Sequence, residues 1–121
     1  MTSATDIIFL RGLAIECTIG FLDWERKVKQ TVVIDLEVPV DCARAAEQDD
    51  VSQTVDYKAM AKRVSAFVGG SEYLLVETLA HRTALMLLQE FGVAWVRLSL
   101  NKPGAIRGSR DVGVTIERHR S

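Results

Sequence analysis

Cysteine, histidine and proline are scarce in this chain of 121 residues, which has two of each. Two cysteines outside any CxxC spacing argue against a disulfide framework and against a zinc ribbon. The two histidines, His81 and His119, are too few for a three-histidine catalytic zinc site. We therefore expect no metal and no cofactor, and a chemistry that relies on ordinary acids, bases and hydrogen bonds.

The sequence also lacks an excess of charge of one sign and any long apolar run. Its 15 Lys and Arg against 16 Asp and Glu give a net charge of −1, so nucleic acid is not an expected partner. No apolar stretch reaches the roughly 18–20 residues that cross a bilayer, and the N-terminus does not resemble a signal peptide. The length and the normal apolar content of 48% predict one globular domain over residues 1–121, located in the cytoplasm without membrane contact.

Four segments alternate between apolar and polar residues, which predicts β-strands. These segments are residues 7–20, 31–40, 94–101 and 112–117. Between the first two, residues 21–29 are mostly charged or aromatic and predict a loop that is longer than a hairpin needs. Between the last two, residues 102–110 predict a second loop. Long loops often carry function, so both are candidate site segments.

The middle of the chain has helical periodicity. An apolar stripe over residues 57–68 predicts one helix, with Thr54 or Asp56 as N-cap and Gly69-Gly70 as its end. A second helix is predicted from about Leu74 to Phe91. The resulting β-β-α-α-β-β order predicts an α+β fold, with two helices on one face of a four-stranded antiparallel sheet.

Such a sheet has two long edges, and unprotected edges invite pairing with another chain. A ring of protomers that closes into a continuous β-barrel would remove those edges. We therefore predict a homo-oligomer, in which a site shared between subunits would follow naturally.

Five short segments occur in an order and at a spacing that resemble one enzyme family. They are Thr18–Glu25 (TIGFLDWE), Thr54–Tyr57 (TVDY), Leu75–Ala80 (LVETLA), Leu98–Ala105 (LSLNKPGA) and Asp111–Glu117 (DVGVTIE). Together they resemble dihydroneopterin aldolase, a folate-pathway family of the T-fold group, and above all its proteobacterial members. The resemblance implies that four protomers close a β-barrel and that two such rings stack into an octamer.

The resemblance also implies a reaction. The expected substrate is a small pterin, 7,8-dihydroneopterin, cleaved by a retro-aldol step to 6-hydroxymethyl-7,8-dihydropterin and glycolaldehyde. A retro-aldol reaction needs an electron sink, and here the C6=N5 imine of the substrate supplies it, so neither a metal nor a lysine Schiff base is required. Epimerisation to 7,8-dihydromonapterin is an expected side reaction.

Three residues are implied to hold the pterin ring. Glu77, with the backbone of Val76, would bind the ring, and Val55 would be a further substrate contact. A carboxylate suits this role, because a pterin presents an amino group and a ring N–H side by side. Taken alone, Glu77 has a commoner explanation, as a glutamate that compensates the dipole of its helix.

Three catalytic residues are implied as well. Lys102 would remove the proton of the C2′ hydroxyl, Glu25 would lie beside the substrate triol, and Tyr57 would reach in from a neighbouring subunit. Each also has an ordinary explanation, respectively a solvated turn lysine, a solvent-facing loop glutamate and a half-buried helix tyrosine. One departure is Lys29, where many family members have glycine.

Two other functions stay open. A dihydroneopterin triphosphate epimerase of the same fold would need basic residues at the pocket mouth, and Arg26, Lys27 and Lys29 keep that alternative open. A pterin-binding assembly module without catalysis is the other. Arg107 and Arg110, in the second loop, are candidates to promote loss of the proton from the predicted base.

Overall fold

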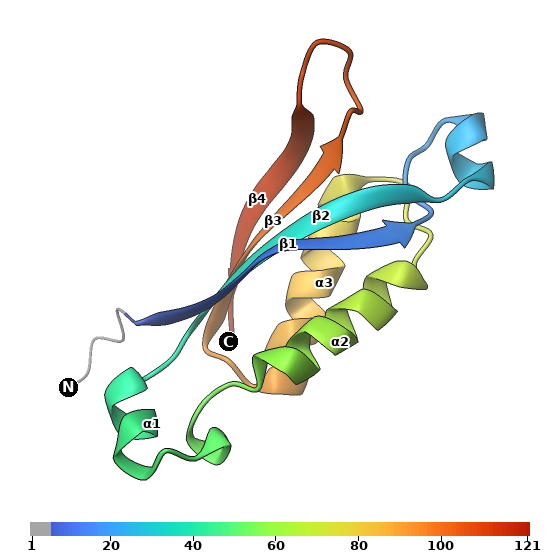
Figure 1. The fold of residues 1–121 in the computed structure, drawn as a ribbon. Helices are drawn as coiled ribbons and strands as arrows, with labels where there is room; N and C mark the ends of the chain where they lie inside the picture. Colours follow the sequence, from blue (N-terminus) through green and yellow to red (C-terminus); the bar gives the residue numbers. More distant parts are fainter. Residues whose placement is uncertain (1–5) are drawn as a thin grey trace.

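Residues 6–121 are the part of the chain that the structure, a computed structural model, describes. Its centre is an antiparallel sheet in the order β1-β2-β3-β4 (Figure 1). The strands are β1 (Ile7–Cys17), β2 (Gln30–Pro39), β3 (Trp95–Pro103) and β4 (Asp111–His119). The predicted α+β class and antiparallel pairing are confirmed. Because β3 extends two residues further than predicted, Lys102 lies within a strand and pairs with Val112.

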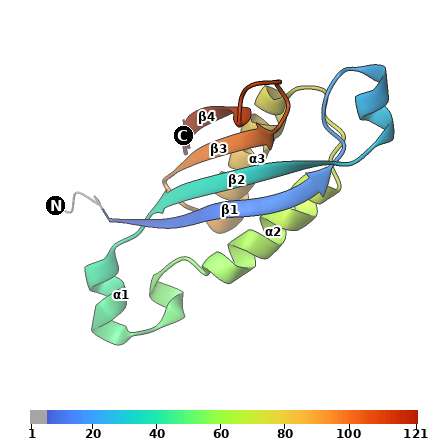
Figure 2. The same ribbon diagram turned by 45° about the horizontal axis from the view of Figure 1, so that its top comes forward.

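Two long helices, α2 (Tyr57–Gly69) and α3 (Val76–Phe91), lie side by side on one face of the sheet, as predicted (Figures 1 and 2). Asp56 is the N-cap of α2, since its side chain accepts a hydrogen bond from the backbone N–H of Ala59 at 3.1 Å. None of the helices in the described chain is long and apolar enough to cross a membrane.

The prediction of two helices is wrong, because a third helix, α1 (Cys42–Gln48), precedes them. It lies beyond the end of the sheet, away from the α2–α3 layer (Figure 1). None of its residues is buried, so it shows no apolar stripe that sequence periodicity can detect. Local capping stabilises it instead: Asp41 accepts a hydrogen bond from the N–H of Arg44, and Asp49 ends it in the left-handed conformation.

The segment predicted as a plain loop between β1 and β2 also differs. It contains a short 3-10 helix, η1 (Asp23–Lys27), in which Glu25 is buried. The N–H groups of Glu25 and Arg26 both bond the carbonyl of Leu22, at 2.9 and 3.3 Å, and this fixes the turn. The segment is therefore ordered by its own backbone and presents Glu25 inward.

The core lies between the helical layer and the inner face of the sheet. Alternate residues of β2, namely Val32, Ile34, Leu36 and Val38, are almost fully buried. They form one cluster with buried residues of the helices, which are Met60, Val64, Val68, Leu79, Ala80, Ala84, Met86, Leu87 and Leu88. Cys17 belongs to the same cluster. This packing fixes the helices on the sheet, and so fixes the loops at their ends.

The role of the core gives a stability prediction. Leu98→Ala should lower the free energy of unfolding by about 2–5 kcal/mol, because Leu98 is fully buried in a central strand and truncation leaves a cavity. Val51→Ala is the matched control, and it should change stability by less than about 0.5 kcal/mol because Val51 is 63% exposed. Urea unfolding measures both, and equal losses would contradict this placement of the core.

Candidate active site

A cleft of about 570 Å³ opens at one end of the molecule, where three segments meet. The segment that contains η1, the start of α3 and the β3–β4 loop supply its walls. Four of the residues implied by sequence line it together: Glu25, Val76, Glu77 and Lys102. Its volume lies within the range typical of small-molecule pockets.

A buried ion pair lies in this cleft. Lys102 Nζ donates a hydrogen bond to Glu25 Oε2 at 2.9 Å, although the two residues are 77 positions apart in the sequence. Their side chains are 14% and 8% exposed. The solvent-facing interpretations of both residues are therefore wrong, and the structure brings together an acid–base pair.

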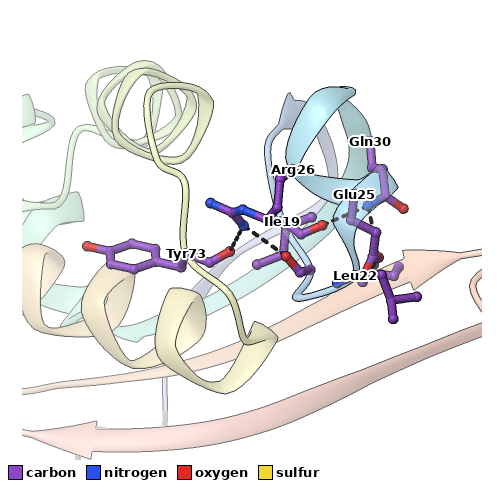
Figure 3. A network of polar contacts seen from close by, with 8 residues as sticks. Ile19, Leu22, Glu25, Arg26, Gln30 and Tyr73 are labelled. Carbon is purple, nitrogen blue, oxygen red and sulfur yellow. Dashed lines mark hydrogen bonds and ion pairs between the residues drawn. The ribbon is translucent and has the colours of Figure 1, made fainter.

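Further hydrogen bonds hold Glu25 in place. The backbone N–H of Leu22 donates to Glu25 Oε1 at 3.2 Å, and Gln30 Nε2 donates to Glu25 Oε2 at 3.1 Å (Figure 3). The same Gln30 amide nitrogen bonds the carbonyl of Ile19 at 2.7 Å, which ties it to the segment that follows β1. Each of these hydrogen-bond donors favours the ionised form of the carboxylate. The pKa of Glu25 is therefore lowered, chiefly by the hydrogen bond from Lys102, although burial alone would raise it.

A glycine makes room for this carboxylate. Gly20 has φ +119°, a backbone conformation that residues other than glycine rarely adopt. In addition, a Cβ atom at this position would lie 2.1 Å from Glu25 Cδ. Any larger residue at position 20 would collide with the carboxyl group. The close approach of backbone to carboxylate therefore depends on this glycine.

The start of α3 forms the opposite wall of the cleft. Val76 is half-buried, and Leu74 and Leu75 present apolar surface to the cleft. Glu77 is exposed in the first turn of α3 and, among residues 6–121, its carboxylate has no hydrogen bond or ion pair. An apolar surface beside a free carboxylate suits a flat heterocycle with adjacent N–H donors.

Tyr57 and Val55 do not lie in this cleft. They line a separate hollow of about 510 Å³ near α1, and Tyr57 is 62% exposed. Tyr57 begins α2, whereas the cleft lies by the loop that follows the other end of α2 (Figure 1). A helix of 13 residues is about 20 Å long, so Tyr57 cannot reach the cleft of its own protomer.

The basic residues whose positions the sequence left open are not cleft residues either. Arg26 directs its guanidinium onto backbone carbonyls, and Arg110 bonds Asp111 at 3.2 Å. None of Arg26, Lys27, Lys29, Arg107 or Arg110 lines the cleft. The charged group in contact with Lys102 is the carboxylate of Glu25. The structure therefore gives no support to the expectation that Arg107 or Arg110 promotes loss of the proton from Lys102.

Sequence reasoning missed two residues that shape the site, Gly20 and Gln30. Gly20 appeared only within a motif, and Gln30 was not singled out. The sequence did offer one indication for Gln30. It is a polar residue at the start of β2, a strand in which every second residue is buried. Within the described chain, no group of three or more His, Cys, Asp or Glu residues is placed to hold a metal ion.

The chain is similar to known proteins in both sequence and fold. The family model for dihydroneopterin aldolase (FolB) matches residues 8–117. The dihydroneopterin aldolase of Escherichia coli strain K12 is 42% identical over 93% of both chains. A crystal structure of the E. coli enzyme in complex with neopterin has a TM-score of 0.91 at 41% identity and covers 94% of this chain and 99% of that one. A Burkholderia thailendensis dihydroneopterin aldolase bound to guanine has a TM-score of 0.79 at 30% identity, with 96% and 92% covered.

The ion pair gives a prediction on pH. In Lys102→Met, the pKa of Glu25 should rise, because the main stabilising hydrogen bond is lost while burial remains. A lowered carboxyl pKa stabilises the fold above the ordinary glutamate pKa, and that contribution is lost as pH falls through the lowered value. The stability gap between wild type and Lys102→Met should therefore be widest at neutral pH and shrink in acid.

Carbon-13 NMR titration of Glu25 and urea unfolding at several pH values measure these effects. Lys27→Met is the control, since Lys27 is exposed and has no contact with Glu25 in the described structure. A Glu25 pKa that stays the same in Lys102→Met would show that the pair does not govern this carboxylate.

Proposed function

This chain belongs to the dihydroneopterin aldolase family of folate synthesis, and we propose that Lys102, Glu25 and Tyr57 carry out the cleavage of 7,8-dihydroneopterin. The observation that carries the proposal is the contact of 2.9 Å between Lys102 Nζ and Glu25 Oε2, inside a cleft of suitable volume and across from Glu77. That contact supports the proposal of a proton-transfer pair beside the substrate side chain.

Glu77 and Val76 would hold the pterin ring. Two relatives are described as binding neopterin and guanine, and both ligands are bicyclic rings with an amino group beside a ring N–H. The free carboxylate of Glu77 can accept both donors as a bidentate pair, while the apolar side chains near it contact the ring face. The triol of the substrate would then lie toward Lys102 and Glu25.

In the proposed reaction, Lys102 first releases the proton of its ammonium group to water. The neutral amine then takes the proton of the C2′ hydroxyl, directly or through a water held by Glu25. The C2′ oxygen forms the aldehyde of glycolaldehyde as the C1′–C2′ bond breaks. The electron pair of that bond moves through C1′ into the C6=N5 imine, so no metal and no lysine Schiff base takes part. C1′ then receives a proton, with Tyr57 and water as the relay, and the ring product remains.

Tyr57 and Val55 would come from a neighbouring protomer. Both lie at the end of α2 remote from the cleft, and Tyr57 is exposed there. The edge strands β1 and β4 each pair with one neighbour in the described sheet, so another protomer can pair with each edge. We therefore propose a closed ring of four protomers, stacked in pairs into an octamer, with active sites between subunits.

The alternatives receive less support. A triphosphate epimerase would need cationic side chains at the cleft, and none of the basic residues considered for that role lines it. Epimerisation of the C2′ hydroxyl remains a proposed side reaction, because the same bond can re-form on the other aldehyde face. A binding module without catalysis would not need the buried ion pair of Glu25 and Lys102.

We also propose one domain over the whole chain and a cytoplasmic location. The two free cysteines are in accord with that location.

Product analysis tests the reaction and its base together. Wild type incubated with 7,8-dihydroneopterin should release 6-hydroxymethyl-7,8-dihydropterin, as measured by chromatography. Lys102→Ala should lower kcat by about 10²–10⁴-fold, the usual contribution of general acid–base catalysis. Lys102→Arg should be almost as slow, because a guanidinium keeps its proton.

Two comparisons complete this experiment. Lys27→Ala should match wild type, and guanine should bind Lys102→Ala nearly as well as wild type because Glu77 holds the ring. If Lys102→Ala weakened substrate binding but left kcat unchanged, Lys102 would be a clamp and not the base. Absence of the pterin product with wild type would refute the proposed activity itself.

The shared site gives a prediction about mixed oligomers. Lys102→Ala and Tyr57→Ala should each be nearly inactive alone. Unfolded together and refolded as mixed rings, they should regain activity, since about one interface in four then combines an intact Lys102 with an intact Tyr57. Turnover assays and light scattering measure this result. An active monomer, or mixed rings that stay inactive, would contradict a site shared between protomers.

A further inference from the structure

Arg26 forms three hydrogen bonds, all with backbone carbonyls. Its Nη1 atom donates to the carbonyl of Gly20 at 2.8 Å and to that of Tyr73 at 3.1 Å (Figure 3). Its Nη2 atom donates to the carbonyl of Glu72. Gly20 is six residues away in the sequence, whereas Glu72 and Tyr73 are 46 and 47 residues away. The side chain therefore connects two loops that are distant in sequence.

These two loops form facing walls of the cleft. Gly20 and Glu25 line one wall, and the loop of Glu72 and Tyr73 leads directly into Leu74–Glu77, which line the other. Within residues 6–121, no other hydrogen bond joins segment 18–30 to segment 70–77. In addition to the packing that holds the helices on the sheet, the guanidinium of Arg26 therefore links the two walls directly.

We propose that Arg26 is a positioning residue that sets the distance between the ring-binding wall at Glu77 and the proton-transfer pair of Glu25 and Lys102. This inference rests on the function proposed above. Arg26 itself does not line the cleft, so it would act through the two loops and not through contact with the substrate.

The chemistry of arginine suits this task. Its planar group presents several N–H donors in fixed directions, so it can bond carbonyls on both sides at once. Lysine offers one compact ammonium on a flexible stem and cannot hold the same geometry. Because the acceptors are backbone atoms, the link sets the course of both loops. Arg26 is half-buried, which limits competition from water.

The proposal separates two kinds of ligand. A ligand that contains only the ring occupies the wall of Val76 and Glu77 and does not need the other wall. A ligand with both ring and triol must reach both walls at once, so its binding and reaction depend on their spacing. A displacement of about 1 Å between reacting groups can reduce a rate about 10²-fold.

The experiment compares Arg26→Met, which keeps an unbranched stem but removes the guanidinium donors, with Lys27→Met as the matched control. In Arg26→Met, guanine should bind nearly as in wild type, whereas neopterin should bind several-fold more weakly. The value of kcat/KM for 7,8-dihydroneopterin should fall by about tenfold to a hundredfold. Arg26→Lys should recover little of this loss. Lys27→Met should behave as wild type.

A pH profile distinguishes positioning from general loosening of the site. Glu25 keeps its bonds to Leu22, Gln30 and Lys102 in Arg26→Met, so the pH dependence of kcat/KM should keep its midpoint while its height falls. Thermal unfolding of each variant checks that the fold persists.

Equal weakening of guanine and neopterin, a shifted pH midpoint, or full activity in Arg26→Met would each overturn the positioning role. If wild type itself does not convert 7,8-dihydroneopterin, the proposed function fails. The selective loss of neopterin binding then still tests the link between the walls, because it requires no turnover.

Discussion

The contact between Glu25 and Lys102 is the constraint on which the cleft depends. Removing a carboxylate and an ammonium from water is costly unless each finds a partner and the remaining hydrogen-bonding positions are filled. Here Leu22 and Gln30 fill those positions on the carboxylate. The pair therefore requires the segment after β1 and the end of β3 to meet, and Gly20 provides the space in which they do so.

The length of α2 organises the rest of the proposed active site. It separates Tyr57 from the cleft by about 20 Å in the same protomer. Each protomer has the Glu25–Lys102 pair at one end and Tyr57 at the other. In the proposed ring, the two ends of neighbouring protomers would together complete a site at each interface. The open edges of β1 and β4 are the surfaces through which the ring would form.

The basic residues illustrate how position decides role. By sequence, Arg26, Lys27 and Lys29 form a cationic run that suits a phosphate. In the structure Arg26 is fully engaged with carbonyls, and the cleft retains Lys102 as its basic side chain, paired with Glu25. This arrangement fits a neutral triol better than a triphosphate. Arg26 contributes by holding loops together, a role that no charge pattern indicates.

The sequence by itself determined the strands, the two long helices and their common face, because burial of alternate or every third to fourth residue is a local property. Periodicity could not reveal α1, which has no buried residue and is defined by its caps. The motifs indicated Glu25, Val76, Glu77 and Lys102 as site residues. Only the tertiary structure decided that these four share one cleft, that Gly20 and Gln30 shape it, and that Tyr57 lies remote from it. The physical reason is that contacts between residues as far apart as 77 positions follow from the path of the whole chain, whereas a residue pattern reports only on its own element.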